Sequence, residues 1–238
     1  MKIDRTKNAG RNIVFGCMLK IYQIVMPFIM RTLMIYYMGI QYLGLNSLFT
    51  SILQVLNLAE LGVGSAMVYS MYKPIAVDDK KMICALMKLY RTYYRVIGII
   101  IAFLGLCLVP FIPKLIKSDV PADINIYVLY ILNLSVTVLS YWLFAYKNCL
   151  LDAHQRTDVA SKVTLVTNTL QYIVQFFTLC FLKNYYAYII VSLAAQALTN
   201  ILTAVVTTHM YPDYRPEGNL SKEVISGINR RIRDLFTS

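Results

Sequence analysis

Residues 163–182 read VTLVTNTLQYIVQFFTLCFL, and after Lys183 residues 184–212 continue as NYYAYIIVSLAAQALTNILTAVVTTHMYP. Neither segment contains Lys, Arg, Asp or Glu. A helix needs about 20 largely apolar residues to cross a hydrocarbon core of about 30 Å, and each segment is long enough. Because backbone polar groups in lipid must bond within their own segment, we expect helices and not strands. The two segments therefore predict two membrane-spanning helices joined by a tight turn.

Four more segments toward the N-terminus are also largely apolar, although the first contains Lys20 and Arg31 and the second contains Glu60. Hydrophobic residues make up 58% and charged residues 15% of the 238 positions, whereas soluble domains average about 45–50% and about 25%. The predicted fold class is thus an all-α integral membrane protein with a six-transmembrane-helix bundle. The expected spans are residues 12–37, 45–71, 96–113, 124–146, 163–182 and 187–209.

The distribution of positive charge predicts the orientation of these spans. If the N-terminus is cytoplasmic, only four of the 23 Lys and Arg residues fall on the opposite side. These four are Arg31, Lys114, Lys117 and Lys183. Cytoplasmic loops carry an excess of Lys and Arg, so both termini are expected in the cytoplasm. The net charge of +11 then reflects topology and contact with anionic membrane lipid, and it does not indicate nucleic-acid binding.

The tail differs from the spans, which suggests a division into a six-span lobe at 1–209 and a cytoplasmic segment at 210–238. Apolar residues recur in the tail at helical spacing, with basic residues between them. Such a basic amphipathic helix can lie on the inner leaflet; a plain linker helix is the other interpretation. The apolar positions are Leu220, Val224, Ile225, Ile228, Ile232, Leu235 and Phe236.

Polar residues within the spans share helix faces and are the main functional signal. An amide facing hydrocarbon without a partner is costly, so these faces meet other helices or a wet cavity. Interhelical hydrogen bonding explains one or two such residues per span. A hydrated vestibule suited to carbohydrate explains longer stripes better. The predicted cavity-lining residues from these stripes are Gln54, Asn57, Glu60, Asn168, Gln171, Gln175, Gln196 and Asn200.

Two basic residues, Lys20 and Arg31, share one face of the first span. Charges at the centre of a membrane are costly and usually have partners. Lys20 and Glu60 are expected at similar depth, which would allow an ion pair. Arg31 has no acidic residue at its depth and is a candidate ligand for an anionic group such as a phosphate. The alternative for Arg31 is that it extends toward the outer membrane interface.

The sequence contains no arrangement typical of an enzyme. Neither a phosphate-binding glycine loop nor a nucleophile elbow is present, and the two histidines are not paired with acids at metal-ligand spacing. We therefore expect no catalytic residues, no metal and no cofactor. Asp152 and Asp158 are expected to be solvated loop charges. The five cysteines, none in a CxxC pair, are expected to pack between helices.

Six short motifs occur in order along the chain: NAGRN (8–12), RT (31–32), QYLGLNSLF (41–49), LAELGVG (58–64), YKPIA (72–76) and YRVIG (94–98). This ordered set resembles that of bacterial polysaccharide-export flippases of the multidrug/oligosaccharidyl-lipid/polysaccharide exporter superfamily. The resemblance runs over the whole chain but corresponds only to the first of the two lobes of such an exporter. It implies transport of undecaprenyl-pyrophosphate-linked oligosaccharide across the bacterial inner membrane by alternating access, for O-antigen, capsule or exopolysaccharide. Arg31 and Glu60 fall on family-like positions.

Three functional hypotheses remain open at this point. The first is the oligosaccharide-lipid flippase, here as a truncated or half protein that needs a second lobe or other polysaccharide-assembly proteins as partners. The second is an exporter of drugs or small cations from the same superfamily, which predicts acidic residues in the cavity. The third is a membrane scaffold, or a remnant, that does not transport.

Overall fold

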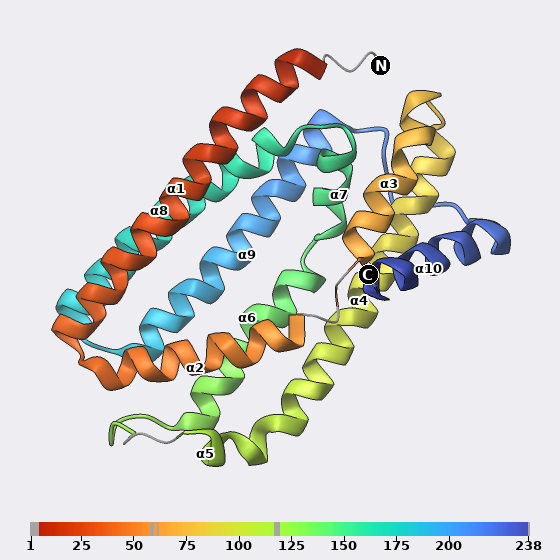
Figure 1. Ribbon diagram of the computed structural model, residues 1–238. Coiled ribbons are helices and arrows are strands. Elements are labelled where there is room, and N and C mark those ends of the chain that lie inside the picture. The colour runs from red at the N-terminus through yellow and green to blue at the C-terminus, as the bar shows by residue number, and fades with distance from the viewer. Residues whose placement is uncertain (1–4, 58–59, 61, 117–119, 238) are drawn as a thin grey trace.

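The computed structural model describes residues 5–57, 60, 62–116 and 120–237, and it is 86% helical with no strand in these ranges (Figure 1). A short 3-10 helix, Val109–Phe111, extends α4, and a short π-helix, Thr178–Leu182, extends α8. The α-helices are α1 (Arg5–Tyr37), α2 (Ile40–Asn57), α3 (Val63–Ala76), α4 (Lys80–Leu108), α5 (Ile112–Leu115), α6 (Ile126–Trp142), α7 (Tyr146–Ala153), α8 (Thr157–Phe177), α9 (Tyr185–Met210) and α10 (Lys222–Thr237).

Four helical segments are long and apolar enough to cross a membrane, as in a multi-pass membrane protein. They are Asn8–Tyr37, Lys80–Leu115, Thr157–Leu182 and Tyr185–Met210, and they contain the expected first, third, fifth and sixth spans. A fifth segment qualifies if α6 and α7, which are bent by 50° relative to each other, count as one broken span. Within the described ranges the structure thus has four or five such segments, against the six expected from the sequence.

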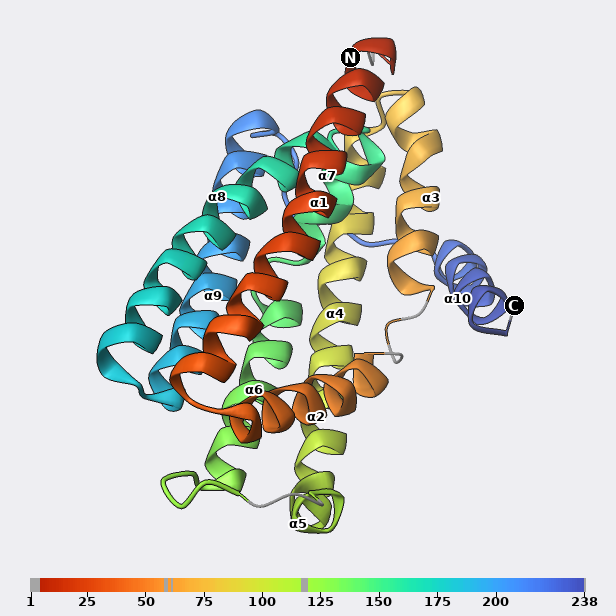
Figure 2. The same ribbon diagram turned by 60° about the vertical axis from the view of Figure 1, so that its left-hand side comes forward.

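The expected second span, 45–71, is divided between two helices. α2 ends at Asn57 and crosses one end of the bundle, whereas α3 begins at Val63 and runs beside α4 (Figures 1 and 2). Residues 58–59 and 61 lie outside the described part of the chain. Gly62 has φ +84°, a left-handed conformation that favours glycine. This change of direction places Glu60 between the two helices and not within a continuous span.

The expected loop after the fourth span is largely helical and buried. α6 ends at Trp142, Phe144 adopts φ +59°, and α7 then begins at Tyr146. Cys149, Leu150 and Leu151 of α7 are buried. Because α7 packs against α3, α4 and α9, this segment forms part of the bundle interior.

Aromatic and apolar side chains fill the interior, while the outer surface is also apolar. Phe49 of α2 and Tyr130 of α6 are fully buried with ring centroids 5.7 Å apart. On α1, by contrast, Ile24 and Phe28 are 73% and 72% exposed. Large exposed apolar surfaces mark contact with membrane or protein. The outward face of α1 therefore has the character expected of a surface that meets lipid tails or another protein.

The only tryptophan in the sequence, Trp142, joins α6 to α4. Its indole Nε1 donates to the backbone oxygen of Arg95 at 3.3 Å. The ring lies over Gly98, where a β-carbon would collide with it. Glycine at this position therefore allows α4 and α6 to approach closely.

The amphipathic tail helix α10 packs against α3 (Figure 2). Its Ile228 is buried. Arg231 donates to Ser70 Oγ at 3.1 Å and lies 4.2 Å from the ring centroid of Tyr69. Tyr93 of α4 donates to Asn229 Oδ1 at 2.5 Å. The apolar side of the helix thus packs on the bundle, while Lys222, Arg230 and Arg233 remain exposed.

Candidate functional site

A cavity of about 750 Å³ lies among α3, α4, α6, α7 and α9. Its lining is mostly polar or aromatic and includes two carboxyl groups, those of Glu60 and Asp152. Binding sites for small molecules are concave and have a few convergent polar groups, which this cavity provides. Tyrosine hydroxyls and side-chain amides supply most of the other polar atoms.

Glu60 is the acidic group at the division between α2 and α3. Its carboxylate accepts a hydrogen bond from the hydroxyl of Tyr94. Nearby, Tyr141 of α6 donates to Asn57 Oδ1 at 3.1 Å. The tyrosine hydroxyls of α4 and α6 therefore hold the polar residues at the end of α2 and at the α2–α3 division.

Three tyrosines form one wall of the cavity. Tyr90 and Tyr94 are one turn apart on α4, with ring centroids 4.4 Å apart, and Tyr94 lies 5.6 Å from Tyr141. Residues spaced by four share a helix face, so α4 presents both rings to the same side.

A small niche lies above Gly64, where this wall meets the Glu60 carboxylate. A β-carbon on Gly64 would be 3.5 Å from the Tyr90 hydroxyl and 3.6 Å from the Tyr94 hydroxyl. The same point is 4.0 Å from Glu60 Oε1. The absence of a side chain on Gly64 therefore leaves a small space that borders three oxygen atoms.

The predicted amides of α9 also line the cavity. Gln196 Nε2 donates to Asn200 Oδ1 at 3.3 Å, and Asn200 Nδ2 donates to the backbone oxygen of Ser140 at 3.4 Å. Gln196, Asn200 and Glu60 are thus the three sequence-predicted residues that the structure brings together in this cavity.

The predicted residues of α8 lie in a different place. Gln175 is 1% exposed and donates to Ser192 Oγ at 2.7 Å and to the backbone oxygen of Tyr188 at 3.2 Å. Gln171 also donates to Ser192 Oγ, at 3.4 Å. These amides join α8 to α9, which is the interhelical role that the sequence left open as the alternative.

The remaining predicted residues are outside the cavity. Lys20 and Gln54 are exposed, Asn168 is half-buried, and none of them is among its lining residues. Arg31 is exposed on α1 and lines a separate pocket of about 470 Å³ together with Gln23 and Phe28. Within the described residues no ion pair joins Lys20 to Glu60, whose carboxylate is bonded to Tyr94 instead.

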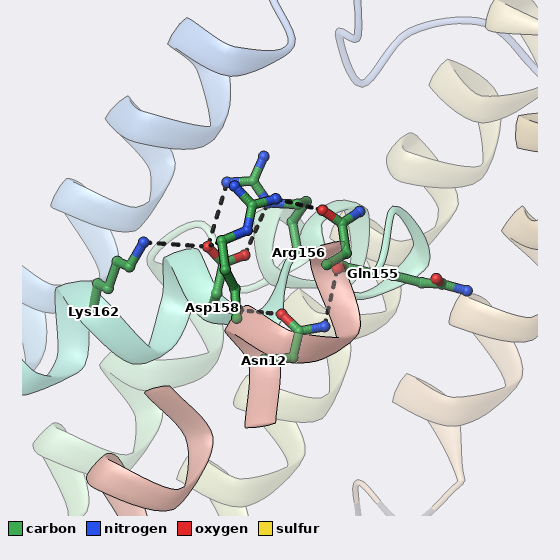
Figure 3. Close-up of polar contacts among 7 residues, drawn as sticks. Asn12, Gln155, Arg156, Asp158 and Lys162 are labelled. Atoms are coloured by element: carbon green, nitrogen blue, oxygen red, sulfur yellow. Dashed lines mark hydrogen bonds and ion pairs between the residues drawn. The ribbon is translucent and has the colours of Figure 1, made fainter. Parts of the chain in front are cut away.

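A second polar cluster ties α1 to the start of α8 (Figure 3). The Asp158 side chain is 0% exposed and accepts from Arg156 Nε at 2.8 Å and from Lys162 Nζ at 3.3 Å. Arg11 Nε lies 4.0 Å from the same carboxylate. Since three cations surround it, Asp158 can remain charged although buried. The expectation of a solvated Asp158 is therefore wrong.

Sequence reasoning missed Asp152 and the tyrosine wall. Both acids of the 147–162 segment were expected in a solvated loop, but this segment is helical and packed. The four-residue spacing of Tyr90 and Tyr94 is a signal that could have identified the wall. In the part of the chain that the structure describes, no group of three or more His, Cys, Asp or Glu residues is arranged to hold a metal ion.

Comparisons with protein-family models, with curated proteins and with solved structures found no match to this chain.

Proposed function

We propose that this chain is part of an exporter of lipid-linked oligosaccharide in the bacterial inner membrane, acting in cell-surface polysaccharide synthesis. In this proposal the glycan occupies the cavity around Glu60 while the lipid part stays in the surrounding bilayer. Undecaprenyl-pyrophosphate-linked glycan is the substrate class implied by the ordered motifs. The positive-inside distribution supports a cytoplasmic location for both termini in this proposal.

The single observation that carries the proposal is a polar cavity of about 750 Å³ within a bundle of membrane-length helices. A glycan presents many hydroxyl groups, which need partners that both donate and accept hydrogen bonds. Tyrosine hydroxyls and the amides of Gln196 and Asn200 can do both. A glycan that crosses the bilayer needs hydrogen-bonding side chains within the membrane. Polar side chains at that depth cost free energy and are therefore usually functional.

Complementation of a bacterial strain that lacks its own oligosaccharide-lipid flippase tests the proposal. Expression of the complete gene encoding this chain should restore surface polysaccharide, measured by gel profile and by antibody binding at the cell surface. Membrane insertion of the protein is verified in the same cells. A well-inserted protein that restores no polysaccharide across a panel of such strains would reject the proposal.

A second candidate, export of organic cations, is favoured by the two carboxyl groups in the cavity. None of the cavity-lining residues that the structure describes is Lys or Arg. Cations in a site of low dielectric require counter-charge, which Glu60 and Asp152 would supply. Increased resistance to cationic drugs without a polysaccharide phenotype would favour this candidate over the first.

A further inference from the structure

We infer that the cavity discriminates among glycans by charge, accepting sugars that are uncharged or carry an amino group and rejecting sugars that carry a carboxylate. This inference rests on the proposed function, because it specifies which oligosaccharides that cavity would take. The structural basis is the combination of two acids, an aromatic wall and the niche above Gly64.

The first argument is the sign of the charge in the lining. Glu60 and Asp152 both line the cavity, and the lining residues within the described ranges include no Lys or Arg. Like charges repel, so both carboxylates would repel a uronic acid, and the described lining offers no cation to compensate. Rejection of a wrong ligand by an unpaired like charge is an effective source of specificity.

The second argument is the geometry of the niche. The hydroxyls of Tyr90 and Tyr94 lie 3.5 and 3.6 Å from the position of a β-carbon on Gly64, and Glu60 Oε1 lies 4.0 Å from it. The three oxygen atoms that border this space can each accept a hydrogen bond from a sugar hydroxyl or from an ammonium group, which has three donors. A sugar carboxylate has no donor when ionised and gains nothing from the Glu60 oxygen.

The third argument is the aromatic wall. Rings of Tyr90, Tyr94 and Tyr141 follow one another with centroids 4.4 and 5.6 Å apart. The face of an aromatic ring is negative and attracts cations. The tyrosine wall therefore favours binding of an amino sugar over an anionic sugar. The two carboxyl groups favour the same ligand.

One arginine contacts a lining residue without itself lining the cavity. Arg231 of α10 lies 4.2 Å from the ring centroid of Tyr69, a lining residue, but Arg231 itself is not in the lining. Its guanidinium is engaged by that ring and by Ser70 Oγ at 3.1 Å. The charge that a ligand meets on entering the cavity is thus that of Glu60 and Asp152.

Binding of three tetrasaccharides of similar size tests the inference. The probes are a chitosan tetramer, which is cationic, a chitotetraose, which is neutral, and a tetragalacturonate, which is anionic. Binding to the purified full chain in nanodiscs of zwitterionic lipid is measured by calorimetry at neutral pH. We expect the chitosan tetramer to bind most tightly and the tetragalacturonate at least about tenfold more weakly, a difference of about 1.4 kcal/mol.

Substitutions assign the discrimination to the two acids. A Glu60→Gln/Asp152→Asn double variant should bring the three affinities to within about threefold of one another. Asp213→Asn removes one negative charge from an exposed side chain that pairs with Lys80 outside the cavity, and it should leave the order unchanged. Tightest binding by tetragalacturonate, unchanged discrimination in the double variant, or no binding of any probe would overturn the inference.

The two proposals can fail separately. If the gene restores export only in strains whose glycans carry uronic acids, the charge inference is wrong and the export function stands. If the expected order of binding is observed but no strain is complemented, the cavity has the inferred preference and the export function is wrong.

Discussion

Asn12 of α1 accepts a hydrogen bond from the backbone N–H of Asp158 at 2.9 Å, while its side-chain amide donates to the backbone oxygen of Gln155 at 3.0 Å. One side chain thus satisfies a donor at the start of α8 and an acceptor in the preceding turn. Free N–H groups in the first turn of a helix need such partners. Asn12 therefore fixes the N-terminal part of α1 to the α7–α8 turn.

Replacement of Asn12 tests this connection. Asn12→Ala leaves two backbone groups without their partner, which should lower stability by about 1–3 kcal/mol. The measurement is the thermal midpoint of detergent-solubilised protein, followed by size-exclusion chromatography after heating. Gln23→Ala, at an exposed position of the same helix, is the control and should leave the midpoint nearly unchanged. Equal midpoints for the two variants would show that Asn12 contributes no stability.

Removal of Arg231 should release α10 from α3. Arg231→Ala loses the hydrogen bond to Ser70 and the contact with the Tyr69 ring, and a cation–aromatic contact contributes about 0.5–2 kcal/mol. We expect faster proteolysis by chymotrypsin within residues 222–237. Arg230→Ala removes the same charge from an exposed neighbouring residue and should not change the rate. Identical cleavage of both variants would contradict the docking role.

Two glycines should respond in opposite ways to the same substitution. At Gly62 the backbone has φ +84° and a β-carbon would lie 2.9 Å from Cβ of Leu235 in α10. Gly62→Ala should therefore destabilise the protein. Gly10 is within α1 and its β-carbon would meet nothing within 4 Å, so Gly10→Ala should stabilise it by up to about 1 kcal/mol. Thermal midpoints shifted in the same direction would contradict this prediction.

His154 should make stability fall as the solution becomes acidic. Burial lowers the pKa of His154 below its ordinary 6.5, and the ring packs on Tyr211 with centroids 4.5 Å apart. Because the unfolded chain then binds the proton more tightly, this contribution is present above pH 6.5 and is lost as pH falls through the lowered value. The thermal midpoint should decrease over that range in the parent protein.

A His154→Phe variant keeps an aromatic ring at this site but cannot take up a proton. Its thermal midpoint should depend less on pH than that of the parent between neutral and mildly acidic solution. An unchanged pH dependence would assign the effect to other groups.

Cysteine labelling should separate the cavity amides from the interhelical amides. Gln196 lines the cavity, whereas Gln171 bonds to Ser192 between α8 and α9 and is not in the lining. In a background with the five native cysteines replaced by Ala, Gln196→Cys should react with a charged methanethiosulfonate reagent at least about tenfold faster than Gln171→Cys. Similar rates would mean that the cavity is closed to water or that the α8–α9 contact is open.

The long apolar runs were sufficient to predict the helical class and most of the membrane-length segments. They could not predict the division at residues 57–63, because an apolar run with Asn57, Glu60 and Gly62 is compatible with either one helix or two. Left-handed backbone at Gly62 and packing of α10 against it decide between them. Such a contact joins residues far apart in sequence and has no local signal.

Helical spacing grouped the polar residues by face without revealing what each face meets. Gln175 and Asn200 both bond to a facing helix, yet only Asn200 also lines the cavity. The difference arises from the packing of whole helices. Asp158 shows the same limit, since only the folded arrangement brings Arg11, Arg156 and Lys162 around its carboxylate.

The position of Trp142 gives the molecule an intrinsic optical reporter. It is the sole indole in the sequence and directly follows Tyr141, whose ring forms part of the cavity wall. Its emission spectrum can therefore register occupancy of the neighbouring space without any attached dye. Because all tryptophan fluorescence comes from Trp142, its signal can be used for ligand titrations and rapid-mixing kinetics on unmodified protein.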